Sequence, residues 1–214
     1  MRKYLLVEGI TDVSLVKYIC QKRLRIKFPN SVKKSPIAKV NLVDIHQCED
    51  FYIIDIKGQD NLLHALKTII APFLRGTERI GIVQDADNDF NASKVSIEKA
   101  ITDSEIPREK IQCFLTPNNK DIGDLETLLL STIAKGNKIM SCFDDYKTCL
   151  QEQQTIHTKA LNKGQVYAYT MYSQQGENLY KPQDSFIHKD IDTKLWDLDN
   201  KKFKPLIDFI LSTF

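Results

Sequence analysis

Carboxylates gather in one short stretch of the sequence, Gln84-Asp85-Ala86-Asp87-Asn88-Asp89, where three aspartates fall within five residues. Like charges placed this close together repel one another unless a cation lies among them. Asp85 and Asp87 are two residues apart, so their side chains point to the same side if the chain stays extended. Oxygen ligands in that arrangement suit a hard divalent ion such as Mg²⁺, which keeps water in its other positions. On its own, an Asp-x-Asp pattern is also typical of a solvated loop.

The residues before this stretch predict the element that positions it. Arg79-Ile80-Gly81-Ile82-Val83 is a short apolar run rich in β-branched residues, which is typical of a buried strand in a parallel sheet. Ligands of open α/β sheets bind at the carboxyl ends of the strands. The aspartates that follow the run are therefore predicted to lie at the binding edge of a sheet.

Two further acidic pairs occur at predicted element ends. Glu8 follows a predicted strand at residues 3–7 and Asp12 lies in the helix after it, while Asp124 and Glu126 open a later helix. If the two acid-tipped strands are neighbours, their carboxylates meet in one crevice. Asp12 and Asp124 have a second interpretation, because Asp in a first helical turn complements the helix dipole and Asp at an N-cap accepts a backbone hydrogen bond.

Hydrophobic periodicity predicts an α/β fold. Strands are predicted at residues 3–7, 51–56, 79–83 and 111–115. Helical apolar stripes separate them, at residues 12–27, 60–73 and 92–103. This alternation predicts a doubly wound, Rossmann-like, mostly parallel sheet of about four strands flanked by helices. Residues 30–50 are predicted to form a polar, basic loop around a short strand at residues 38–45.

The second half of the chain changes to helical periodicity. Helices are predicted from Asp124 and near residues 139–151, 158–172 and 203–214. We interpret residues 1–115 as the α/β core and residues 116–214 as a C-terminal helical extension that packs on the core within one domain.

Composition excludes several classes. The 214 residues are 42% hydrophobic and 27% charged, as in a globular protein, and the apolar runs are too short to span a membrane. The start of the sequence has no signal-peptide pattern, and five cysteines without a CxxC pair favour reduced thiols in the cytoplasm. The net charge of +2 argues neither for nor against a polyanionic partner. Residues 13–43, however, contain no acid and eight basic residues, which suit either a solvated helix face or a phosphate backbone.

Two motifs resemble the Toprim superfamily of topoisomerases, bacterial primases and certain nucleases: Val7-Glu8-Gly9 after the first strand and Asp85-Ala86-Asp87 after a later one. Small stand-alone bacterial Toprim-like proteins of unknown function are more similar still, through Leu125-Glu126-x-x-Leu129-Leu130 and Trp196-Asp197-x-Asp199. The layout is also similar to the Toprim part of overcoming-lysogenization-defect nucleases, although those often carry Ser where this chain has Asp124.

The resemblance implies a function and a set of site residues. The metal ligands it implies for one or two Mg²⁺ or Mn²⁺ ions are Glu8, Asp12, Asp85, Asp87, Asp124 and Glu126. Glu8 is the ligand or general base, and Gly9 and Asp89 support the ligands. A cation must neutralise the charge that develops on the phosphate, and the candidates are Lys120, Lys159 and Lys163. The implied reaction is metal-dependent cleavage of nucleic acid, DNA more than RNA.

Other functions stay open. The chain has no Gly-rich phosphate loop of its own, and the resemblance therefore implies a separate ATPase partner and a role in defence against phage. Assembly of several copies of this chain into a homo-oligomer is a further alternative. The alternative function is a non-catalytic module that binds nucleic acid or protein and retains the metal pocket. Phosphatase chemistry of the haloacid-dehalogenase type is disfavoured, because the Asp-x-Asp follows a later strand and its fifth residue is Asp89.

Overall fold

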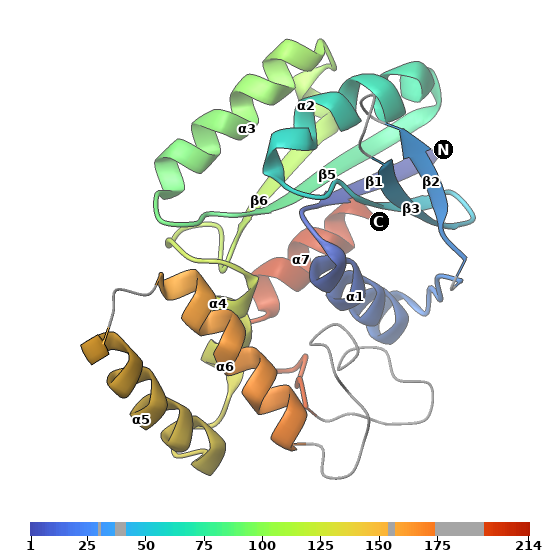
Figure 1. The fold of residues 1–214 in the computed structure, drawn as a ribbon. Helices are drawn as coiled ribbons and strands as arrows, with labels where there is room; N and C mark the ends of the chain where they lie inside the picture. Colours follow the sequence, from blue (N-terminus) through green and yellow to red (C-terminus); the bar gives the residue numbers. More distant parts are fainter. Residues whose placement is uncertain (30, 37–41, 154–156, 174–194) are drawn as a thin grey trace.

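The computed structural model describes residues 1–29, 31–36, 42–153, 157–173 and 195–214, which form a mixed α/β fold (Figure 1). One six-stranded sheet has the order β2-β3-β4-β1-β5-β6. The strands are β1 (Arg2–Val7), β2 (Lys33–Pro36), β3 (Leu42–Cys48), β4 (Phe51–Asp55), β5 (Thr77–Asp85) and β6 (Ile111–Thr116). Strands β4, β1, β5 and β6 run parallel, whereas β2 and β3 pair antiparallel at one edge.

The prediction of about four strands was therefore too low. Residues 30–50 were predicted to be mostly loop, but they contain both β2 and β3. Strand β2 reads Lys33-Lys34-Ser35-Pro36, and such a polar, proline-containing edge strand has no hydrophobic alternation to reveal it. Residues 38–41 of the predicted strand 38–45 lie outside the described residues.

Helices surround the sheet: some cover its two faces, and others lie beyond its carboxyl edge (Figure 1). They are α1 (Ile10–Ile19), α2 (Leu62–Ala65), α3 (Phe90–Ser104), α4 (Leu125–Thr132), α5 (Lys138–Gln153), α6 (Thr158–Ser173) and α7 (Lys204–Thr213). Shorter turns are η1 (Cys20–Leu24), η2 (Gln59–Asn61), η3 (Leu66–Ile70), η4 (Ala71–Gly76) and η5 (Arg108–Lys110). The predicted helix 12–27 instead runs from Ile10 through η1 and stops at Arg25, whose φ of 58° is left-handed.

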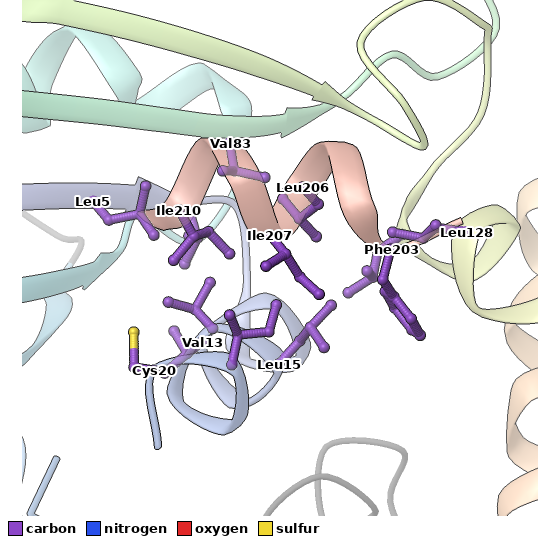
Figure 2. Close-up of a cluster of buried hydrophobic side chains, with 14 of the residues drawn as sticks. Leu5, Val13, Leu15, Cys20, Val83, Leu128, Phe203, Leu206, Ile207 and Ile210 are labelled. Carbon is purple, nitrogen blue, oxygen red and sulfur yellow. The ribbon is translucent and has the colours of Figure 1, made fainter. Parts of the chain in front are cut away.

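Alternating side chains of β1 pack into two hydrophobic cores, one on each face of the sheet. Leu5 enters one core with α1, α4 and α7, and Leu6 enters the other with α2, η3 and α3. Figure 2 shows the first core, where α7 lies across the strands and points Ile207 and Ile210 toward α1. At Gly81 a Cβ would lie 2.7 Å from Leu5 and 2.8 Å from Thr213, so only glycine admits α7 this close.

The fold brings the carboxyl ends of β4, β1, β5 and β6 to one edge, and α4 and α6 lie beyond that edge (Figure 1). Among the described residues, no helix combines the length and the apolar character needed to cross a membrane.

Candidate metal-binding site

The two strands that end in acids are neighbours. β1 and β5 pair in parallel, with Val7 opposite Val83, which confirms the expected adjacency. Glu8 follows β1 and Asp85 ends β5, and the Asp85 N–H donates to Glu8 Oε2 at 3.4 Å. Two strands distant in the sequence therefore present their acids at one point on the sheet edge.

Four of the six predicted ligands line a single pocket of about 270 Å³. They are Glu8, Asp12, Asp85 and Glu126. Gly9 lies on the pocket wall, and Lys159 and Lys163 from α6 are its basic residues. Each element contributes by its terminus: β1 and β5 by their ends, α1 and α4 by their first turns.

Asp85 is buried and fixed on one side. Its Oδ1 accepts hydrogen bonds from Thr116 Oγ1 at 2.8 Å and from the Leu125 N–H at 3.1 Å. Its Oδ2 lies 3.0 Å from Lys159 Nζ. Two neutral donors therefore orient the carboxylate, and the other oxygen remains for a cation.

Asp87 reaches the same lysine from a different direction. Its Oδ1 lies 2.7 Å from Lys159 Nζ. Its backbone has a φ of 50°, and its carbonyl accepts from the Gly123 N–H at 2.8 Å. The extended geometry that would place Asp85 and Asp87 side by side thus ends at Asp85. Asp87 lines an adjoining pocket of about 720 Å³ instead, together with Asp124 and Asn162.

Three predicted site residues cap helices. Asp12 Oδ2 accepts from the Gly9 N–H at 3.1 Å, Asp124 Oδ1 accepts from the Thr127 N–H at 2.7 Å, and Asp89 Oδ1 accepts from the Ala92 N–H at 2.9 Å. The N-cap interpretation of Asp124 is therefore confirmed, and Asp12 lies in the first turn of α1, the position that the helix-dipole interpretation requires. Asp12 keeps its place on the acidic pocket all the same, whereas Asp124 and Asp89 lie in the adjoining one.

The electrostatics of the acidic pocket favour a bound cation. Burial and then the charge of Asp85 raise the pKa of Glu8 to about 7. Burial and the neighbouring acids also raise the pKa of Asp12, and burial with the charge of Asp124 raises that of Glu126. Carboxylates with raised pKa values are held in an unfavourable field, which a divalent ion would relieve.

The positive charge of Lys159 partly offsets the negative charge of the acidic pocket. Burial alone would lower the pKa of Lys159, but Asp85, Asp87 and Glu8 together raise it. Of the three lysine candidates, Lys159 and Lys163 line the acidic pocket, whereas Lys120 is exposed in the loop after β6. The sequence alone had no basis for this choice, because 72 residues separate Lys159 from Asp87.

Within the part of the chain that the structure describes, no three His, Cys, Asp or Glu side chains are already arranged to hold a metal ion. The Lys159 ammonium lies between Asp85 and Asp87, where a shared cation would neutralise the same charges. The donor set of carboxylate oxygens fits Mg²⁺ or Mn²⁺, provided that Lys159 moves away from Asp85.

The residues that hold the acids in place belong to none of the sequence motifs. Thr116, at the end of β6, fixes Asp85, and Asn162 on α6 donates to Thr127 Oγ1 at 3.1 Å. The position of Thr116 at a strand end on the same edge was the available indication.

Comparisons with known proteins identify a family and a fold. The profile of the family described as "Protein of unknown function (DUF3226)" matches residues 2–214. No curated protein sequence matches the chain significantly. A crystal structure of hypothetical protein PH0156 from Pyrococcus horikoshii OT3 is similar, with a TM-score of 0.55 and 16% identity, over 100% of this chain and 95% of that one. At that identity the similarity shows the fold alone.

Proposed function

We propose that this chain, which belongs to the family of unknown function DUF3226, is a Toprim-like enzyme that cleaves phosphodiester bonds of nucleic acid with Mg²⁺ or Mn²⁺. The observation that supports this proposal is the convergence of Glu8, Asp12, Asp85 and Glu126 on one pocket beside Lys159. Nucleic acid, with DNA favoured over RNA, is the substrate class that the motif resemblance implies.

The acidic residues would hold the metal. Glu8, Asp12, Asp85 and Glu126 provide hard oxygen ligands on the pocket wall, with Asp87 and Asp124 in the adjoining pocket. When bound, the ion activates water and neutralises charge on the phosphate. Thr116 and the Leu125 N–H keep Asp85 oriented for this purpose.

Glu8 suits the role of general base. Its pKa of about 7 lies near neutral pH, where a base combines adequate ionisation with adequate proton affinity. In this proposal Glu8 takes the proton from the attacking water, and Lys159 turns from Asp85 to the non-bridging phosphate oxygens as their charge increases.

A second candidate is a non-catalytic binding module that keeps the acidic pocket. The observation in its favour is the pair of short contacts from Lys159 to Asp85 and Asp87, since an internal ammonium can neutralise the pair without a metal. Either function is compatible with a separate ATPase partner and with defence against phage, which we propose from the motif resemblance.

Supercoiled plasmid incubated with the purified protein and Mn²⁺ separates the two candidates. We expect nicked or linear product, measured on agarose gels, and no product with EDTA or with Asp85→Ala. The matched control is Asp44→Asn, which alters the other lysine-bridged aspartate pair, and this variant should cleave normally. No cleavage of the plasmid or of single-stranded DNA by the wild type, with or without an added ATPase, or equal cleavage by Asp85→Ala, would eliminate the enzyme.

A further inference from the structure

One face of α6 extends from the acidic pocket to an exposed tyrosine and an exposed methionine. Lys159 and Lys163 line the pocket, and Tyr167 and Met171 follow at intervals of four residues, with exposures of 45% and 53%. Residues four apart share one face of a helix. In Figure 1, α6 begins beside the carboxyl edge of the sheet and runs away from it.

Other residues of α6 make its known packing contacts. Leu161, Val166 and Thr170 are among its buried residues. Asn162 bonds to Thr127 of α4, and Gln165 Nε2 donates to Asp144 of α5 at 3.2 Å. Tyr167 is not among these residues and is 45% exposed, so the chain presents an aromatic ring one turn beyond a pocket lysine.

The order of chemical types along α6 fits a nucleic-acid strand. Ammonium groups suit phosphates, and an exposed ring stacks on an unpaired base regardless of its identity. Eight helical residues from Lys159 to Tyr167 span about 12 Å, which is a few nucleotides at about 3.4 Å or more each. Lys163 also lines a pocket of about 570 Å³ with Asn88 and His157, so the lysines border open space on both sides.

We infer that the exposed face of α6 binds single-stranded nucleic acid, with Lys163 on a phosphate and Tyr167 stacked on a base, and leads the strand to the acidic pocket. A base inside a duplex hides its face in the stack, so Tyr167 would favour unpaired over paired substrate. This inference rests on the proposed function and narrows its substrate to a single strand or an unpaired end.

The test is fluorescence anisotropy with the full chain in Ca²⁺, using labelled thymidine and uridine homopolymers of about 20 nucleotides and a mixed-sequence duplex of equal length. We expect Tyr167→Ala to weaken single-strand binding about tenfold, Tyr167→Trp to restore it, and duplex binding to stay unchanged. Lys163→Ala should reduce the slope of log affinity against log salt concentration by about 0.7. The two homopolymers report whether DNA or RNA is bound.

Tyr146→Ala is the matched control, because Tyr146 is 55% exposed and lies on a different helix, α5. Unchanged single-strand binding by a folded Tyr167→Ala variant, an equal loss with Tyr146→Ala, or an equal loss for duplex would overturn the inference. A changed sedimentation coefficient of Tyr167→Ala would instead identify a surface between copies of the chain, and would also overturn it. Failure of the proposed function gives a different result: intact strand binding in Ca²⁺, but no cleavage of the same labelled strands when Mn²⁺ replaces Ca²⁺.

Discussion

Two lysines bridge aspartate pairs at the same edge of the sheet. We call the first pair closed, because its lysine and both aspartates come from neighbouring segments of the chain. Lys57 Nζ lies 2.6 Å from both Asp44 Oδ2 and Asp55 Oδ2. The Lys57 N–H also donates to Asp55 Oδ1 at 3.0 Å. All three residues come from β3, β4 and the turn that follows, so the chain satisfies this charge within 14 residues.

We call the second pair, Asp85 and Asp87, open, because its lysine comes from a distant helix. Lys159 reaches Asp85 and Asp87 from α6, across 74 and 72 residues. Around it lie further acids, Glu8 and Asp12 among them, that no local lysine neutralises and whose pKa values burial and mutual repulsion raise.

The difference between the pairs is one of charge balance and of reversibility. Lys57 can leave its aspartates only by uncovering Asp55, whose side chain is 0% exposed. Asp85 and Asp87 are 10% and 27% exposed, and Lys159 comes from a separate helix, so it can exchange with a divalent ion at modest cost. We therefore propose that a lysine-bridged aspartate pair is structural in one place and a ligand site in the other, and the variants below separate the two roles.

The largest effect is expected at the base. Glu8→Gln should lower the rate of metal-dependent cleavage at pH 7 by about 100-fold or more, because a positioned general base contributes at least that much. Initial rates on plasmid across pH 5–9 measure it, and the wild-type rate should rise as Glu8 ionises, at a pH that a bound ion lowers from the metal-free Glu8 pKa of about 7. Asp44→Asn should stay within about twofold of wild type at every pH. A Glu8→Gln enzyme that retains its rate would assign the proton transfer elsewhere.

The closed pair should dominate stability. Lys57→Met should lower the free energy of unfolding by about 2 kcal/mol, since it leaves the buried Asp55 carboxylate without its cation, and the exposure of Lys57 reduces the effect. Urea denaturation measures the loss. Mn²⁺ should not restore it, whereas adding Asp55→Asn should recover part. Restoration by Mn²⁺ would mean that this pair also binds metal.

Removal of the open pair's lysine should change metal affinity instead. Lys159→Met should bind Mn²⁺ about tenfold more tightly, or about 1.4 kcal/mol, because its ammonium no longer competes for Asp85 and Asp87. The variant should cleave more slowly, since it also lacks the cation that faces the phosphate. Titration calorimetry measures the affinity. Unchanged or weaker Mn²⁺ binding would show that Lys159 does not occupy the metal's place.

The sequence predicted what depends on local pattern. Apolar periodicity located the four parallel strands and α3, and the acids at strand ends followed from the sheet edge. It could not locate β2, whose four residues carry no alternation, and it predicted one helix at residues 60–73 where the chain forms η2, α2, η3 and η4. Which hydrogen-bond ladder a turn adopts depends on packing, not on periodicity.

The site shows the same boundary between local and long-range information. The pairing of Glu8 with Asp85 required only that two predicted strands be adjacent. The bridge from Lys159 required the position of α6, which lies beyond the sheet in the sequence and which no motif of the strands determines. The divergent directions of Asp85 and Asp87 depend on the left-handed backbone of Asp87, and an Asp-x-Asp pattern does not specify that conformation.

The smallest expected effect is a pH dependence of stability in the open pair. Folded Glu8 keeps its proton up to about pH 7, whereas the ordinary glutamate value is 4.5. Between these values the folded chain binds more protons than the unfolded chain, so the free energy of unfolding falls as pH rises. Asp12 and Glu126 act in the same direction.

From pH 6 to pH 8 in EDTA, Glu8 alone should account for a loss of about 1 kcal/mol in the free energy of unfolding, measured by urea denaturation. Glu8→Gln should flatten the curve, and Lys57→Met should shift it without changing its slope. Saturating Mn²⁺ should reverse the slope for the wild type, because metal binds the ionised carboxylates. A slope that metal does not change would show that Mn²⁺ does not bind these carboxylates.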